Sequence, residues 1–191
     1  MNPGSIPGRV ALFFLFNLRL IPKPFSRWFL LAICAALGLA GCAETPPYQY
    51  EYVPGRTATV TAYGTAVAPP NAPAAVRAAI DAGNEIAGSP YQYGGGHGER
   101  RGGFDCSGAT SYVLRAAGRL RDSMPSEGFR QYGESGPGRW ISVYARDGHV
   151  FLVIAGLRFD TGYNGEHDSG PRWTRRGRPA DGCVVRHPAG L

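Results

Sequence analysis

Hydrophobic residues recur at helical spacing in two stretches of the chain. Between residues 75 and 86 they fall mostly on one face of an amphipathic helix, and the Gly-Ser-Pro sequence at 88–90 would end it. The segment 109–117, ATSYVLRAA, is a second helix candidate. The pattern therefore predicts two helices, joined by a segment rich in glycine.

Apolar runs of strand length dominate the last third of the chain. Residues 139–146 and 149–155 are rich in strand-forming residues, and the Asp-Gly pair between them is a hairpin signal. A further run covers residues 157–161. Helices followed by hairpin-linked strands predict an α+β domain whose helices pack on an antiparallel sheet.

A different pattern marks the amino-terminal region. Residues 28–41 form an apolar run of about 14 residues behind a basic flank, the length of a signal-peptide core and short for a membrane span. The run ends in Leu39-Ala40-Gly41-Cys42, which resembles the lipobox of bacterial lipoproteins and implies a lipid on Cys42. A transmembrane anchor remains the alternative, because a second apolar stretch precedes this one. For the same reason a start codon nearer Lys23 stays open.

We therefore expect three regions. Residues 1–41 would be the signal peptide with its lipobox, and residues 42–71, rich in Pro and Thr, an extended tether. Residues 72–191 would form one domain, a usual size for a single hydrophobic core.

The net charge changes when the signal segment is removed. The whole chain carries +6, but four basic residues and no acidic one precede Cys42, so the remainder has 16 basic and 14 acidic residues, or +2. Such a balance argues against nucleic acid as a partner, because phosphate binding needs a concentrated basic surface. The cluster formed by Arg172, Arg175, Arg176 and Arg178 is more simply a solvated surface segment.

Cys106 is the first candidate for chemistry, because it lies where the second helix would begin. Unpaired backbone N–H groups and the helix dipole stabilise a thiolate there, which would lower the pKa of the thiol. Asp105 and Ser107 flank the sulfur and are suited to cap the helix. A buried structural cysteine is the competing interpretation.

Two motifs in order give the Cys106 region a family resemblance. Pro90-Tyr91-Gln92-Tyr93-Gly94-Gly95 precedes Asp105-Cys106-Ser107-Gly108 at a spacing that resembles the NlpC family of cell-wall cysteine peptidases. The resemblance covers about residues 75–190. It implies a papain-like fold, in which the helix that carries the nucleophile packs on the antiparallel sheet.

The resemblance also implies a base, which a Gly-His pair at the start of a strand supplies. Here that residue is His149, although a lone strand histidine is often structural. We expect Asp160 as the third member, because a two-residue turn near residues 155–156 would place it on the same sheet face as His149. The family more usually has His, Asn or Gln at this position, and His167 is the alternative.

Four further residues are expected to contact substrate. The resemblance assigns this role to Tyr91 near the nucleophile and to Ser126 in the segment after the helix, and Asp105 and Ser107 flank the sulfur. Packing is the alternative for Tyr91.

Other kinds of site find little support in the sequence. The glycine-rich run at 94–103 lacks the Lys-Ser/Thr ending of a phosphate loop, and the four histidines lack zinc-ligand spacing, so we expect neither nucleotide, metal nor other cofactor. A disulfide between Cys106 and Cys183 would silence the nucleophile and is the main rival to catalysis.

Together these features predict a secreted, lipid-anchored peptidoglycan hydrolase. By resemblance its partner is the stem peptide of peptidoglycan, and the bond is that between γ-D-glutamate and diaminopimelate. We expect a monomer in the cell envelope, on the outer membrane facing the periplasm if the cell has two membranes. A non-catalytic wall-binding lipoprotein and a papain-like amidase or acyltransferase remain alternatives.

Overall fold

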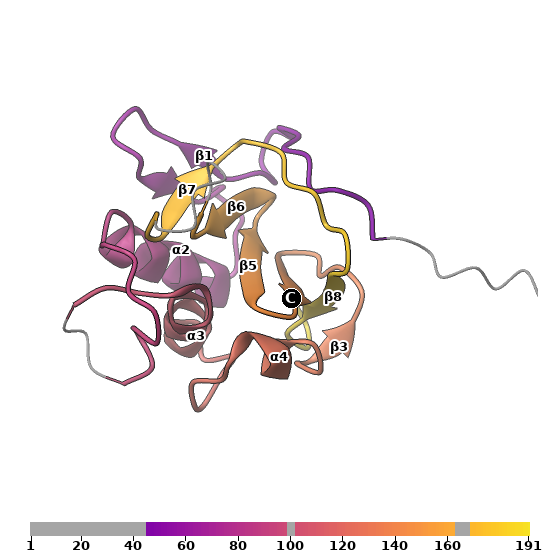
Figure 1. The fold of residues 1–191 in the computed structure, drawn as a ribbon. Helices are drawn as coiled ribbons and strands as arrows, with labels where there is room; N and C mark the ends of the chain where they lie inside the picture. Colours follow the sequence, from indigo (N-terminus) through magenta and orange to yellow (C-terminus); the bar gives the residue numbers. More distant parts are fainter. Residues whose placement is uncertain (1–44, 99–101, 163–168) are drawn as a thin grey trace, which may run out of the picture. The chain divides into compact units, whose positions relative to one another are not determined.

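The described part of the chain folds as helices packed on an antiparallel sheet. The computed structural model describes residues 45–98, 102–162 and 169–191, and residues from Glu44 onward form one unit. Its helices are α2 (Ala74–Ile86), α3 (Cys106–Ala116) and the short α4 (Ser126–Phe129). The mixed α+β class predicted from the sequence is confirmed, as are helices at the two expected places (Figure 1).

One antiparallel sheet contains most of the strands. Its order is β3-β8-β4-β5-β6-β7, and every neighbouring pair is antiparallel. The strands are β3 (Glu134–Ser135), β4 (Ile141–Arg146), β5 (His149–Ile154), β6 (Leu157–Asp160), β7 (Arg172–Thr174) and β8 (Val184–His187). Strands β1 (Thr59–Val60) and β2 (Ala66–Val67) form a separate two-stranded hairpin.

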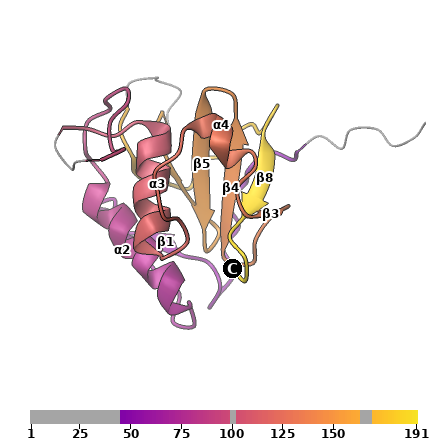
Figure 2. The same cartoon turned by 90° about the horizontal axis from the view of Figure 1, so that it is seen from below.

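The two faces of the sheet have different neighbours. Val150, Leu152 and Ile154 of β5 belong to the main core together with apolar residues of α2 and α3, which lie on one side of the sheet (Figure 2). Because side chains alternate along a strand, His149 and Phe151 point to the other face. There Phe151 packs in a smaller cluster with Tyr48. His149 at the start of β5 and Asp160 at the end of β6 therefore share the sheet face opposite to that of Val150.

The segment expected to be a tether is instead part of the domain. Tyr48 is 4% exposed, and its backbone pairs with that of Arg178 through two hydrogen bonds of 2.8 and 3.0 Å. Ala58 is fully buried, and its N–H donates to the carbonyl of Ala155 at 2.7 Å. Tyr48 and Tyr50 pack on the domain and alternate with the exposed Gln49 and Glu51, which is typical of an extended segment with one buried side (Figure 1).

The amino-terminal predictions fall outside the described residues. The signal peptide, the lipobox and Cys42 lie in residues 1–44. In the part of the chain that the structure covers, no helix combines the length and the apolar character that crossing a bilayer requires.

Candidate active site

Cys106 is the first residue of α3, and Asp105 caps that helix. Oδ1 of Asp105 accepts a hydrogen bond from the N–H of Gly108 at 2.6 Å and another from the hydroxyl of Ser107 at 3.0 Å. Its Oδ2 accepts from the N–H of Gly94 at 2.9 Å. One carboxylate therefore fixes both the start of the helix and the glycine-rich segment beside it.

Two glycines let that segment approach the helix closely. The carbonyl of Gly95 accepts a hydrogen bond from the N–H of Asp105 at 3.2 Å. A Cβ on Gly108 would lie 1.9 Å from the same carbonyl oxygen, far inside van der Waals contact. This contact gives a physical reason for finding the Gly-Gly and Asp-Cys-Ser-Gly sequences together.

The thiol of Cys106 is free and half-buried, next to the start of β5. Burial is the main cause that raises its pKa, and the charges of Asp105 and Asp160 act in the same direction. Hydrogen bonds from the backbone N–H groups of Val150 and Ser107 oppose this change and lower the pKa. The lowered pKa predicted for this thiol is wrong, because burial and the charges of two carboxylates outweigh the two backbone hydrogen bonds.

The contact with Val150 fixes where the sulfur lies. The backbone of Val150 directly follows His149, so the thiol lies beside the first residues of β5. Strand β6 ends at Asp160, one residue short of the position that would pair with Val150 in the register of this hairpin. The rival disulfide is contradicted, since both Cys106 and Cys183 are free.

His149 begins β5 directly after a tight turn. Arg146 pairs with His149 across β4 and β5, which leaves Asp147 and Gly148 as the two-residue turn that the sequence predicted. Helix α4 and its C-cap hold this turn: the N–H of Gly148 donates to Glu127 at 3.3 Å, and an exposed ion pair joins Asp147 to Arg130, the residue after α4. Contacts from the α4 region therefore stabilise the turn from which His149 begins β5.

Asp160 lies beside His149, as the register argument predicted. Leu152 pairs with Phe159 and Ile154 with Leu157, so paired residue numbers have an odd sum, and Asp160 shares the face of His149. Oδ1 of Asp160 is 2.9 Å from Nε2 of His149. The carboxylate is fully buried, while the imidazole retains 16% side-chain exposure. A buried acceptor on Nε2 leaves Nδ1 as the nitrogen that can exchange a proton with a reactant.

Two arginines also face Asp160, and neither was linked to this acid from the sequence. Nη1 of Arg178 is 2.9 Å from Oδ2, and Nε of Arg158 is 3.4 Å from it. Arg158 is 1% exposed, and burial lowers its pKa while the charge of Asp160 raises it. Arg178 had been assigned to a solvated cluster. It is instead partly buried against the acid, at 19% side-chain exposure.

The four residues expected to contact substrate differ in burial and in the elements that carry them. Tyr91 is partly buried, and its backbone forms a parallel bridge with Phe104, two residues before the nucleophile. Asp105 and Ser107 are buried, and their oxygens take part in the helix cap. Ser126 is 7% exposed at the start of α4. The alternative base partner, His167, lies outside the described residues.

His97 is a further polar neighbour of the nucleophile helix. Its Nε2 is 3.3 Å from Oδ1 of Asp105 and 3.1 Å from Oγ of Ser107. From the sequence, this histidine was weighed only as a zinc ligand. Among the described residues, no three His, Cys, Asp or Glu side chains gather as they would around a metal ion.

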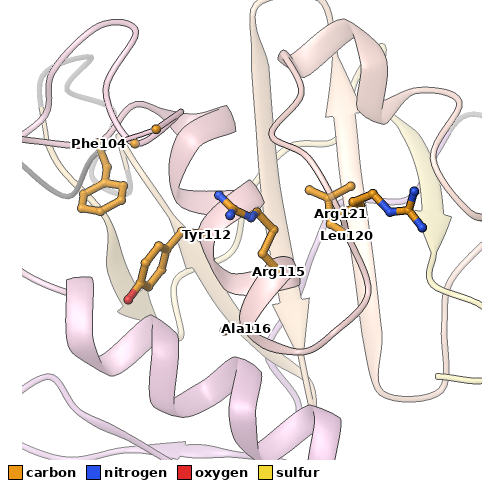
Figure 3. Close-up of a pocket in the computed structure, with 8 residues that line it drawn as sticks. Phe104, Tyr112, Arg115, Ala116, Leu120 and Arg121 are labelled. Carbon is orange, nitrogen blue, oxygen red and sulfur yellow. The ribbon is translucent and has the colours of Figure 1, made fainter.

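A cavity of about 500 Å³ lies along α3 but does not include Cys106. Phe104 and Tyr112 form one side of it, and Arg115 and Arg121 come from the end of α3 and the loop that follows (Figure 3). The remaining lining residues are Gly96, Gly98, Ala116 and Leu120. The cavity is therefore separate from the Cys106, His149 and Asp160 cluster.

Comparison with solved structures shows a distant structural likeness. No family model matches the sequence, and no curated protein matches it. A solved structure of a mutated form of the resuscitation promoting factor interacting protein RipA is similar at 21% sequence identity, with a TM-score of 0.43. The match covers 82% of this chain and 79% of that one. The residues of this chain, rather than this likeness, support the function proposed below.

Proposed function

We propose that this protein is a peptidoglycan hydrolase that cleaves stem peptides with Cys106 as nucleophile and His149 as base. Asp160 orients the base. The observation that carries the proposal is the buried contact of 2.9 Å between His149 and Asp160, at the start of a strand whose Val150 N–H hydrogen-bonds to the free thiol of Cys106. Nucleophilic catalysis by a thiol needs these three functions in one place.

The first step follows from the state of the thiol. Burial raises the pKa of the Cys106 thiol, which favours its protonated form. Nδ1 of His149 takes this proton as the sulfur attacks the scissile carbonyl, and a C–S bond forms while the carbonyl oxygen gains the negative charge. Asp160 stabilises the imidazolium through Nε2–H.

The second step returns the proton. His149 donates it to the leaving amine as the C–N bond breaks, which leaves a thioester on Cys106. Water then attacks the thioester, with His149 again as base, and the thiol is restored. Tyr91, whose backbone pairs with the segment leading into Cys106, is our candidate for binding the carbonyl.

Sequence motifs support the fold family and the substrate. A helix that carries the cysteine and a sheet that carries histidine and acid are consistent with the papain-like arrangement implied by the NlpC resemblance. The same resemblance leads us to propose the γ-D-glutamyl-diaminopimelate bond. We also propose that a lipid on Cys42 retains the protein in the cell envelope.

Cleavage of purified sacculi, followed by mass spectrometry of the released muropeptides, tests the proposal. Cys106→Ala should lose turnover by at least a factor of about 10³, because the nucleophile itself is removed. Cys183→Ala is the matched control, since that cysteine is free and precedes β8, on a different element from Cys106, His149 and Asp160. Equal turnover by Cys106→Ala and the unaltered protein would refute the mechanism.

One observation favours the wall-binding alternative, namely the raised pKa of the Cys106 thiol, which reduces its reactivity at neutral pH. A binding protein would sediment with sacculi, release no muropeptide and leave Cys106 unlabelled by a thiol-directed activity probe. An amidase or acyltransferase would label Cys106 and yield a different product mass.

A further inference from the structure

The two carboxylate oxygens of Asp160 face different kinds of side chain. Oδ1 faces Nε2 of His149 at 2.9 Å, and Oδ2 faces Nη1 of Arg178 at 2.9 Å. Arg158 approaches Oδ2 from the same strand at 3.4 Å. A carboxyl group with no solvent exposure keeps its charge only when cations or donors compensate it, and here arginines supply that compensation.

The two arginines are held by loops rather than by the sheet alone. Nη1 of Arg158 donates to the carbonyls of Arg176 and Gly177 at 2.9 and 3.0 Å. Nη1 of Arg178 donates to the carbonyl of Gly162 at 3.2 Å, and its guanidinium lies 5.5 Å from the ring centre of Phe151. Residues 175–178, which follow β7, therefore help to orient both guanidinium groups: they bind Arg158 and include Arg178.

Residues 45–58, at the start of the domain, hold this loop segment in turn. The backbone of Tyr48 pairs with Arg178 in both directions, and its ring lies 5.9 Å from the guanidinium of Arg158. The Tyr48 hydroxyl donates to the carbonyl of Gly156 at 2.8 Å. Figure 1 shows the two segments side by side above the sheet.

The same amino-terminal segment also supports the turn that sets the register of Asp160. Ala155 and Gly156 join β5 to β6 with φ of 46° and 75°, the positive values of a type I′ turn. The N–H of Ala58 donates to Ala155, and Tyr48 donates to Gly156. Residues 45–58 therefore fix β6 at both ends. They hydrogen-bond directly to the turn that precedes β6, and they hold Arg178, which contacts Asp160 at the other end.

We infer that Arg178 is a positioning residue, which residues 45–58 hold in place so that it orients Asp160 toward His149. This inference rests on the proposed function of His149 as base. The segment expected to be a tether is accordingly part of the catalytic apparatus.

The pH dependence of the reaction tests the role of Arg178. The charged or titratable groups near Arg178 and Asp160 are Arg158 on β6, His149 on β5, Cys106 on α3, Cys183 before β8 and Tyr48 in the amino-terminal segment. Asp105 lies beside the sulfur, and Glu127 of α4 contacts the turn before His149. Loss of a nearby positive charge raises the pH at which neighbouring groups release a proton. Arg178→Gln should therefore move both limbs of the bell-shaped kcat/KM profile to higher pH by roughly one unit.

Arg175→Gln is the matched control. Arg175 lies in the same segment, is exposed and places its guanidinium 6.0 Å from the ring centre of Tyr50 rather than at the acid. Its profile should coincide with that of the unaltered protein. Coincidence of the Arg178→Gln profile with both would overturn the inference.

Two further measurements keep the outcome decisive. If Arg178→Gln fails to fold, Arg178→Lys keeps the charge but not the planar donor geometry, so kcat should fall about tenfold with an unchanged pH profile. Wild-type kcat in that variant would overturn the inference. The pH dependence of Cys106 alkylation by iodoacetamide reports on the same charges without any hydrolysis. It therefore distinguishes failure of the Arg178 role from failure of the proposed hydrolase.

Discussion

At the scale of single residues, the reactivity of Cys106 depends on opposing effects. Burial and the charges of Asp105 and Asp160 raise the pKa of the thiol, and backbone N–H groups lower it. The helix dipole alone is therefore a poor guide to this cysteine. The acid that caps the helix also disfavours the thiolate next to it.

Replacement of the cap separates these two effects. Asp105→Asn keeps a good capping side chain but removes a negative charge, so the pKa of the Cys106 thiol should fall. Half-maximal alkylation should then occur at lower pH, with a stability cost below about 1 kcal/mol. Asp122→Asn, in an exposed loop after α3, should leave the alkylation profile unchanged. An unchanged or upward-shifted profile for Asp105→Asn would contradict the assigned cause.

The sequence predicted the positions of the candidate site but not its electrostatics. Cys106 at a helix start, His149 after a turn and Asp160 on the same face all follow from local patterns and strand parity. Arg158 and Arg178 do not, because their contact with Asp160 depends on how a loop outside the sheet returns to it. Burial of the thiol likewise depends on the packing of α3 against β5.

At the scale of elements, the backbone of the glycine-rich segment lies in close contact with the start of α3. Gly95 and Gly108 meet with no space for a side chain, and Asp105 links both segments by hydrogen bonds. The start of α3 and the loop that leads to it therefore form one unit. A substitution in either segment should therefore alter the position or surroundings of the Cys106 sulfur.

Gly108→Ala tests this unit. The added methyl group would lie 1.9 Å from the Gly95 carbonyl oxygen, so the loop must move and the domain should lose about 1–3 kcal/mol of stability. This loss would exceed the gain in helix propensity of alanine over glycine. Gly98→Ala is the control, because no atom lies within 4 Å of its added Cβ. Urea denaturation measures both, and equal midpoints would show that the contact relaxes without cost.

At the scale of the whole domain, the largest difference from the sequence prediction is where the domain begins. Pro and Thr content favoured a tether over residues 42–71, yet Tyr48, Ala58 and Ala66 are buried. Composition describes the average of a segment, whereas packing here depends on a few small or aromatic residues at the right positions. The alternation of Tyr48 and Tyr50 with the polar Gln49 and Glu51 was the available signal.

Truncation distinguishes a tether from a structural segment. A chain that starts at Ala72 loses the burial of Tyr48 and Ala58 and their hydrogen bonds, so its unfolding free energy should fall on the order of 4 kcal/mol. A chain that starts at Glu44 should retain the stability of the domain. Chemical denaturation followed by tryptophan fluorescence compares the two. The tether interpretation would regain support if their transitions coincide.

The division of the candidate site between two layers has a consequence for its response to heat. The sulfur belongs to the helical layer, and the imidazole with its acid belongs to the sheet. Warming that loosens one layer against the other would separate the reacting groups while the secondary structure of each is still intact. Catalytic competence would accordingly be the first property lost, at a temperature where the far-ultraviolet circular dichroism of the folded chain persists.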